Sequence, residues 1–173
     1  LVPLMKDGHA FMDRIVGFRK QHARDMGLVI PKVKVTDNVQ LAPNHYRVNI
    51  QGSRVGEGQV HLEKTMALST DGPPKLPGGI EAREPAYGLP ALWIDGAAVD
   101  EAKTRGYTLV DAQTVLITHL SELLKKHSAE LLSRRETEQM IDQVRKRDRT
   151  LVEELIPSVM SISDVQKVLQ LLI

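Results

Sequence analysis

Residues 46–50 read Tyr46-Arg47-Val48-Asn49-Ile50, with an apolar side chain at every second position. Because successive side chains of a β-strand point to opposite faces of a sheet, this period of two predicts a half-buried strand. The same period recurs in the flanking residues, at Val33, Val35, Val60, Leu62, Met66 and Leu68. Turn-forming residues separate these runs, namely Asp37-Asn38, Gly52-Ser53 and Gly56-Glu57-Gly58. The sequence therefore predicts a small, mostly antiparallel sheet of three or four strands between residues 33 and 68.

The segment that precedes this region predicts a helix over residues 10–26. Its apolar face recurs at helical spacing, through Phe11, Ile15, Phe18, His22 and Met26. Gly27 then stands where helices commonly end in a left-handed residue. Gly17 lies in the middle of the helix, where glycine costs about 1 kcal/mol relative to alanine. Its position indicates either close packing or a point at which the helix flexes.

The segments that follow the sheet predict shorter elements. Residues 71–79 are rich in glycine and proline, so we expect a loop there. A strand over 91–94, a helix over 97–104 that stops before Gly106 and a strand over 107–110 come next. Asp111 is placed to cap a long helix over residues 112–132. The buried stripe expected on that helix consists of Leu116, Leu120, Leu123, Leu124 and Leu131.

The C-terminal third predicts a succession of helices. Three segments match the capping-box pattern, in which a hydroxyl and an acid or amide three residues later satisfy each other's backbone amides. They are Ser133–Glu136, Thr150–Glu153 and Ser163–Gln166, and Pro157 is expected to end the middle helix. The fold class expected for the whole chain is therefore α+β, with a small sheet, covering helices and a helical C-terminal part.

Composition excludes several classes of function. The chain of 173 residues is 42% hydrophobic and carries a formal net charge of +1, which gives no general argument for nucleic-acid binding. It has no cysteine, so disulfides and thiolate metal sites are excluded. No run reaches the roughly 18 apolar residues that span a bilayer. We expect a soluble fragment of a longer protein, without membrane contact of its own.

The residues that could carry chemistry favour structural roles. His119 and His127 are eight positions apart on one expected helix, so about 12 Å separates their Cα atoms and one metal ion cannot join them. The glycines of residues 52–58 lack the Lys-Ser/Thr of a phosphate loop, which favours a hairpin. The basic cluster over 145–149 fits a solvated helix end or a contact with an acidic partner or neighbouring subunit. We therefore expect no catalytic residue, cofactor or metal.

The chain, most distinctively from residue 84 onward, resembles the cytoplasmic domain of the export-gate proteins of flagellar and related type III secretion systems, the FHIPEP family. The resemblance covers about residues 10–173. The segments that carry it share an ordered series of matches with the family: 13–20, 25–28, 37–41, 46–48, 84–94, 106–111, 114–122, 130–131, 135–137, 151–157 and 168–172. Residues 63–80 depart most from the family pattern.

This resemblance implies a domain organisation and a role. The first cytoplasmic subdomain would comprise residues 10–83 with 132–150, an inserted α/β subdomain 84–131, and the start of a helical third subdomain 151–173. Family members form a ring of nine copies at the cytoplasmic face of the bacterial inner membrane. That ring receives complexes of export chaperones with their substrates, contacts other proteins of the export apparatus, and helps order export. A virulence secretion homologue with the same role is the close alternative to a flagellar one.

The resemblance also implies site residues. Chaperones dock in a hydrophobic dimple of the inserted subdomain, and Tyr107 and Thr137 match positions that belong to it. The family usually has phenylalanine at the position of Tyr107, so this hydroxyl changes the polarity of the dimple. Gly17 matches a family glycine linked to flexing between subdomains. From a different class, the competing hypothesis is a small metabolic enzyme with its site in the loops of residues 52–80.

Overall fold

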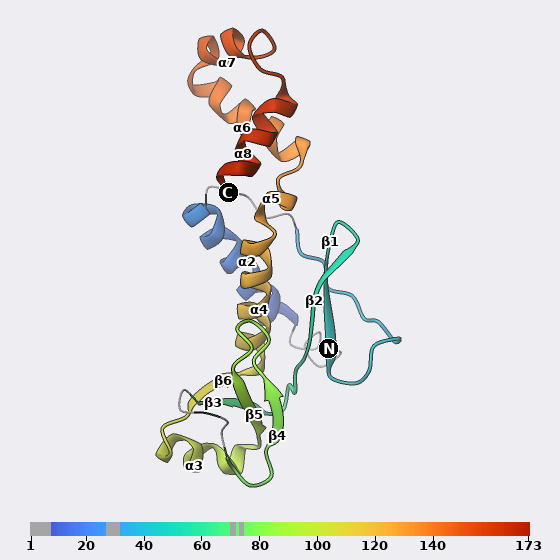
Figure 1. Cartoon of the computed structure of the whole chain (residues 1–173), viewed down its shortest axis with the longest axis vertical. Coiled ribbons are helices and arrows are strands. Elements are labelled where there is room, and N and C mark those ends of the chain that lie inside the picture. The colour runs from blue at the N-terminus through green and yellow to red at the C-terminus, as the bar shows by residue number, and fades with distance from the viewer. Residues whose placement is uncertain (1–7, 27–31, 70–71, 73–74) are drawn as a thin grey trace. The chain divides into compact units, whose positions relative to one another are not determined.

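The structure is a computed structural model that describes residues 8–26, 32–69, 72 and 75–173. Its elements, in chain order, are α2 (Gly8–Met26), β1 (His45–Ile50), β2 (Ser53–Gln59), β3 (Thr65–Leu68), β4 (Ile80–Arg83), β5 (Pro90–Ile94), η1 (Gly96–Ala98), α3 (Val99–Thr104), β6 (Thr108–Asp111), α4 (Ala112–Lys126), α5 (Ser128–Leu131), α6 (Arg134–Arg147), α7 (Arg149–Leu155) and α8 (Ile162–Leu172) (Figure 1). The mixture of helices with antiparallel strands confirms the α+β class. Gly27, expected to end α2, lies outside the described residues.

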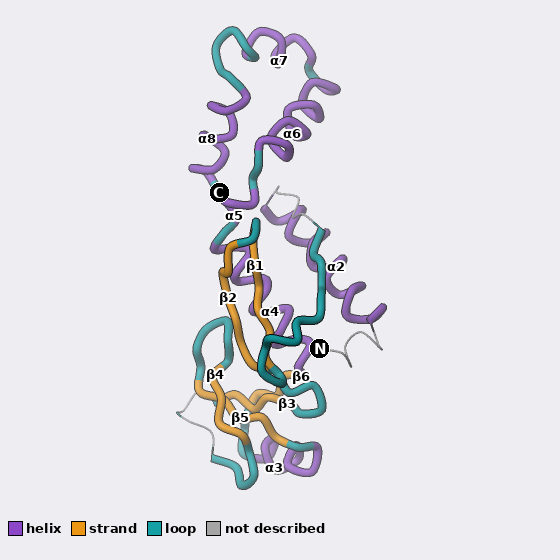
Figure 2. Tube along the Cα trace, turned by 90° about the vertical axis from the view of Figure 1, so that its right-hand side faces the viewer, coloured by secondary structure: helices purple, strands orange, loops and turns teal. Residues whose placement is uncertain are grey.

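The chain divides into two compact units, and each is described by itself. The first unit joins the chain up to Val16 with Val33–Leu123, and the second joins Gly17–Lys32 with Leu124–Ile173. All the strands belong to the first unit, whereas the described part of the second consists of helices and their connections (Figure 2). The division into subdomains at residues 83/84, 131/132 and 150/151 stays a prediction.

Strands β1 and β2 form an antiparallel hairpin with a two-residue turn. Gln51 and Gly52 occupy the turn with φ angles of 49° and 86°, the left-handed values that such hairpin turns require. The sequence also predicted a turn at Gly56 and Gly58, and that prediction is wrong because both lie inside β2. A Cβ atom on Gly56 would lie 2.5 Å from Cδ1 of Leu123, and one on Gly58 would lie 2.6 Å from Oη of Tyr46. These glycines therefore permit close approach of side chains to the strand.

A second sheet has the strand order β4-β5-β3-β6, with every neighbouring pair antiparallel. The prediction of one sheet over residues 33–68 is therefore wrong, because β3 leaves the hairpin and pairs with strands from residues 90–111. Val33 and Val35 form no strand, and Val60 and Leu62 lie in the connection between β2 and β3. A period of two reports which side chains are buried, but it does not specify the strand with which a segment pairs.

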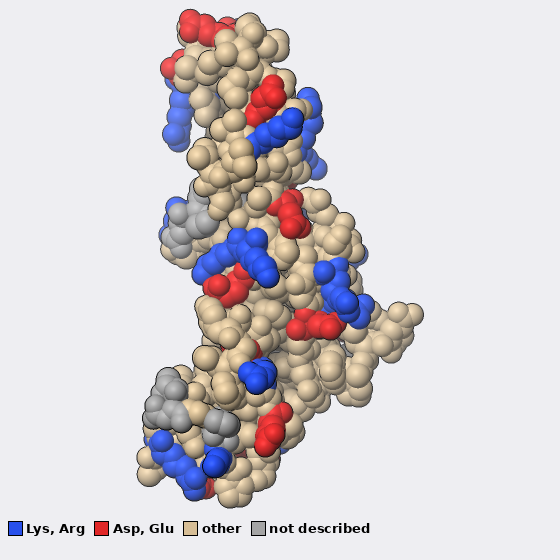
Figure 3. Space-filling view, in the orientation of Figure 1, with Lys and Arg blue, Asp and Glu red and all other residues tan. Residues whose placement is uncertain are grey.

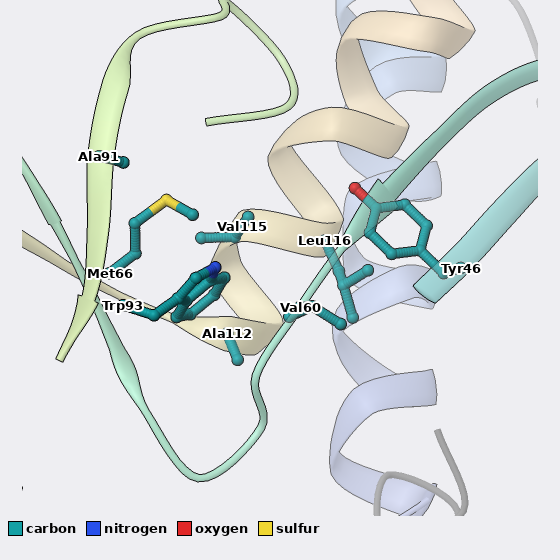
Figure 4. Packing of buried hydrophobic residues seen from close by; sticks show 8 residues of the cluster. All are labelled: Tyr46, Val60, Met66, Ala91, Trp93, Ala112, Val115 and Leu116. Atoms are coloured by element: carbon teal, nitrogen blue, oxygen red, sulfur yellow. The ribbon is translucent and has the colours of Figure 1, made fainter. Parts of the chain in front are cut away.

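The two central strands of the second sheet, β3 and β5, are buried on both faces, and each face contributes to a separate hydrophobic cluster. Trp93 and Ala91 of β5, with Met66 of β3, pack against α4 through Ala112, Val115 and Leu116, as Figure 4 shows. The alternate residues Leu92, Ile94 and Ala67 pack on the other face with Ala102 of α3 and with Leu76. We call these the α4 face and the α3 face. The unbroken burial of Ala91–Ile94 explains why this strand reads as a continuous apolar run.

Local hydrogen bonds fix the start of α4. The Asp111 carboxylate accepts from the backbone amide of Thr114 at 2.9 Å, so the predicted cap is confirmed. Arg14 of α2 donates to Asp111 at 3.3 Å and to the hydroxyl of Thr114 at 3.0 Å. The helix expected over residues 112–132 is interrupted at His127, where the backbone leaves helical geometry between α4 and α5.

In the second unit, the helix starts differ from two of the three predicted capping boxes. Ser133 caps α6 as predicted. Helix α7, however, is capped by Asp148, which accepts from the amide of Leu151 at 3.0 Å, and not by Thr150. Helix α8 begins at a capping box between Ser161 and Asp164, two residues before the predicted Ser163. Ser161 and Asp164 fit the same pattern, with aspartate as the acid three residues after the serine. Helix α7 ends at Leu155, shortly before the predicted stop at Pro157.

Candidate functional site

Tyr107 lies just after the C-terminal end of α3, where backbone hydrogen bonds fix its position. Gly106 adopts a φ of +78°, and its amide donates to the carbonyl of Lys103 at 2.9 Å. The amide of Tyr107 donates to the carbonyl of Ala102 at 3.0 Å. These two bonds form a Schellman motif, which places an apolar residue just beyond the helix against the helix itself. The strand expected from 107 therefore begins one residue later, at Thr108.

The Tyr107 side chain is half-buried and packs against the α3 face of the sheet. Its hydroxyl does not lie free, since it accepts a hydrogen bond from the backbone amide of Lys75 at 3.2 Å. Arg105 contacts the same residue, donating to the carbonyl of Lys75 at 2.9 Å. The same guanidinium donates to the carboxylate of Glu101, one helical turn earlier, at 2.5 Å. The result is an aromatic side chain at the surface, bordered by charged groups.

Thr137 lies in the second unit, on α6, and is 0% exposed. Its hydroxyl donates to the carbonyl of Ser133 at 3.0 Å, so its polar atom is used within the first turn of the helix. Tyr107 and Thr137 thus belong to different units, and the structure does not show them as parts of one surface. A fully buried threonine can shape α6, but in this conformation it cannot itself contact a partner.

Gly17 lies within α2, at the position where the chain passes from the first unit to the second. A Cβ atom added to it would meet nothing within 4 Å, and its φ lies outside the left-handed range. Close packing, one of the two interpretations of this glycine, is therefore excluded among the described residues. The other interpretation, a flexible point in the helix, stays a prediction.

The loop between β4 and β5 holds an exposed aromatic residue that the sequence reasoning did not select as a site. Glu84 is only 5% exposed, and its carboxylate accepts from the amides of Ala86 at 2.8 Å and Tyr87 at 2.7 Å. Arg83 donates to the carbonyl of Gly88 at 2.9 Å. Tyr87 itself is 62% exposed on this fixed loop. Gly88 and the two flanking prolines signal a turn, but no local pattern reveals which acid is buried.

Tyr46 and His119 form a buried polar pair beside the α4 face. The Tyr46 hydroxyl lies 2.6 Å from Nδ1 of His119. Burial, followed by the negative charge of Glu84, raises the pKa of Tyr46, so its hydroxyl stays protonated and donates a hydrogen bond to Nδ1 of His119. Burial lowers the pKa of His119, and Glu84 opposes this in part. Neutral His119 therefore acts as an acceptor that satisfies a buried hydroxyl.

The described ranges contain no group of three or more His, Cys, Asp or Glu side chains that could hold a metal ion. Within those same ranges, no helix combines the length and the apolar character that crossing a membrane requires. Basic and acidic side chains are interspersed over the face drawn in Figure 3. The basic cluster over residues 145–149, where α6 ends and α7 begins, is exposed, and its members Arg145 and Arg149 pair with Asp142 and Glu153 at 2.5 and 2.6 Å.

Comparison with known proteins finds a family that matches this chain. The model of the FHIPEP family matches residues 1–173. The chain belongs to the FHIPEP family. Within the family, it is 45% identical over 171 residues to the flagellar biosynthesis protein FlhA of Bacillus subtilis (strain 168), an alignment that covers 98% of this chain and 25% of that relative. This FHIPEP chain thus spans about a quarter of the length of the curated relative.

Solved structures share the fold of this FHIPEP chain. The Chlamydia pneumoniae CdsV protein superposes with a TM-score of 0.78 at 21% identity, over 94% of this chain and 48% of that one. CdsV in a complex with CdsO gives 0.71 at 23% identity, over 94% and 49%. The nonameric SctV-C of EPEC gives 0.62 at 15% identity, again over 94% and 49%. At these identities the likeness concerns the fold alone.

Proposed function

We propose that this chain is part of the cytoplasmic docking platform of a flagellar type III protein export apparatus, where it binds complexes of export chaperones with their substrates and helps order export. The surface around Tyr107 is the docking site. The single observation that carries the proposal is the half-buried Tyr107 ring, which a Schellman motif holds on the α3 face and which charged residues border. A fixed aromatic anchor with a polar border is typical of the energetic centre of protein interfaces.

Similarity to named relatives supports the flagellar assignment over a virulence secretion system. The Bacillus subtilis relative carries the flagellar name at 45% identity, well above the 15–23% of the structural neighbours CdsV and SctV-C. Two further parts of the proposal are binding to other export proteins and assembly into a ring, for which the CdsV–CdsO complex and the nonameric SctV-C, of the same fold, are precedents. Both would occur at the cytoplasmic face of the bacterial inner membrane.

Thr137 and Gly17 have indirect roles in this proposal. Because Thr137 is fully buried, it contributes by shaping α6 and not by touching the partner. Gly17 lets α2 flex where the two compact units meet along the chain. Glycine suits this role because it lowers the cost of leaving helical geometry.

Substitution of Tyr107 by aspartate tests the docking site. Binding is measured by titration calorimetry, with a purified complex of a Bacillus subtilis flagellar chaperone and its late export substrate as the probe. We expect Tyr107→Asp to weaken binding at least about thirtyfold, the effect of losing an interface anchor. Tyr87→Asp, which places the same charge on the exposed aromatic residue of the β4–β5 loop, is the matched control and should bind like the unmodified chain. Circular dichroism checks that both variants stay folded.

If Tyr107→Asp binds normally, the docking site is elsewhere. If only Tyr87→Asp loses binding, the β4–β5 loop is the site instead.

A further inference from the structure

We infer that Arg105 and the hydroxyl of Tyr107 form a two-point clamp on the main chain of Lys75, and that this clamp fixes residues 75–79 as one border of the docking surface. In this role Arg105 and the Tyr107 hydroxyl are positioning groups, distinct from the Tyr107 ring that would contact the partner. The inference rests on the proposed function, because it specifies how access to the Tyr107 ring is set.

The clamp holds both polar groups of one peptide residue. The amide of Lys75 donates to the Tyr107 hydroxyl at 3.2 Å, and its carbonyl accepts from Arg105 at 2.9 Å. Glu101 accepts from the second nitrogen of Arg105 and therefore orients the guanidinium. The two clamping side chains and Glu101 come from α3 and its immediate C-terminal end, so the clamp is mounted on one helix.

The residues after Lys75 lie close against the α3 face. Leu76 is buried in the same cluster that supports the Tyr107 ring. The amide of Gly79 donates to the carbonyl of Leu76 at 3.4 Å, which closes a turn in which Gly78 has a φ of +75°. A Cβ on Gly79 would lie 3.2 Å from Cδ1 of Leu92, so a larger residue would press on β5. Residues 75–79 are thus held at one end by the clamp and further along by the packing of Leu76 and Gly79 on the sheet, whereas Pro77 and Gly78 are exposed.

A fixed border lowers the cost of binding. A segment that must be ordered when a partner arrives reduces affinity by the entropy lost in ordering it. Since this sequence has tyrosine at position 107, it carries a hydroxyl that a phenylalanine would lack. The clamp gives that hydroxyl a use that does not depend on the partner, because it accepts the hydrogen bond from the Lys75 amide.

Partner-free measurements test the clamp directly. Trypsin cleaves after Lys75, but it must first release Leu76 from the cluster, so the cleavage rate at this bond reports local opening. We expect Arg105→Gln to raise that cleavage rate about tenfold, because it removes a charged hydrogen bond. We expect Tyr107→Phe to raise the hydrogen-exchange rate of the Lys75 amide about fivefold, because it removes a neutral one. Arg105→Lys keeps the charge but lacks the planar fork that reaches both acceptors, so its rate should lie in between. Lys103→Gln, on the same helix at a side chain that pairs with Asp100, is the control and should leave both rates unchanged.

Calorimetry with the Bacillus subtilis chaperone–substrate complex then tests the function of the border. We expect Arg105→Gln and Tyr107→Phe to bind about three- to tenfold more weakly, as a loss of preorganisation predicts. Unchanged cleavage and exchange in both variants would show that no clamp exists. Faster opening with unchanged affinity would show that the border does not position the docking surface. If the unmodified chain binds no complex, both the proposed function and the proposed role of the border in docking are wrong. The cleavage and exchange rates still decide whether the clamp exists.

Discussion

The two faces of the four-stranded sheet use the same strands for different purposes. On the α4 face, the large side chains of Trp93 and Met66 are sealed by a helix of 15 residues. On the α3 face, the cover is a helix of six residues, the small side chain of Ala102 and the short segment that contains Leu76. Tyr107 remains half-exposed there, whereas Trp93 is 1% exposed.

This difference shows how one sheet can both stabilise a domain and present a surface. Burial of apolar area provides most of the stability, and the α4 face buries the larger side chains completely. The α3 face leaves an aromatic ring partly in solvent, where a partner can cover it. A tyrosine illustrates each case. The Tyr46 hydroxyl forms a hydrogen bond with buried His119, and the Tyr107 hydroxyl accepts one from the exposed main chain of Lys75.

The largest expected effect comes from removing the centre of the α4 face. Trp93→Ala should lower the free energy of unfolding by about 3–5 kcal/mol, because it deletes a fully buried aromatic side chain and leaves a cavity. Urea denaturation followed by circular dichroism measures the loss. Leu89→Ala, at an exposed position in the same β4–β5 hairpin, is the control and should change stability by less than about 0.5 kcal/mol. A cost for Trp93→Ala below that of a surface substitution would contradict the sealed character of this face.

The two tyrosines provide an intermediate test. Tyr46→Phe should cost about 1–3 kcal/mol, because it leaves Nδ1 of buried His119 without its donor. Tyr107→Phe should cost less than about 1 kcal/mol, since water can replace the hydroxyl at the exposed amide of Lys75. Both costs are measured by urea denaturation at neutral pH. Equal costs for the two substitutions would remove the distinction between the faces.

The smallest expected effect is a dependence of stability on pH, caused by His119 beside the α4 face. Because burial lowers the pKa of His119 from its ordinary 6.5, the unfolded chain binds a proton more readily than the folded one. Stability should therefore fall as the pH drops below 6.5 and should level off once the pH passes below the folded pKa. The lowered pKa of His61, caused by burial and then by Lys64 and His45, adds a decline of the same sign.

Urea denaturation over a range from about pH 7.5 to about pH 5 measures this decline, since the range brackets the titration of histidine. His119→Asn, which keeps an acceptor near the Tyr46 hydroxyl but does not titrate, should flatten part of it. His61→Asn separates the second contribution. A decline that is unchanged in both variants would have to come from other groups.

Local sequence patterns predicted many elements of the fold correctly, for identifiable reasons. The helical spacing from Phe11 onward predicted α2, and the period of two from Tyr46 to Ile50 predicted β1. Asp111 was expected to cap α4, and Gly106 was expected to end the helix before Tyr107. Each of these depends on side chains or amides within a few residues of one another, so the sequence alone contains the necessary information.

Other features were missed or assigned to the wrong place because they depend on distant residues. Gly56 and Gly58 resemble turn residues, yet they lie in β2, where the side chains of Leu123 and Tyr46 occupy the space that a Cβ atom would need. The resemblance to the family led to Tyr107, but no pattern indicated that its hydroxyl holds Lys75, 32 residues earlier.

The sequence by itself determined the class of the fold, most of its helices and the segments that form strands β1, β3, β5 and β6. It did so because periodicity and capping are local properties of the chain. Only the tertiary structure decided that β3 leaves the hairpin for the second sheet, that Glu84 is buried and that Thr137 is inaccessible. These outcomes depend on contacts between segments that are far apart in the sequence and bury each other's apolar surface. The residues of one strand do not specify the segment against which that strand packs.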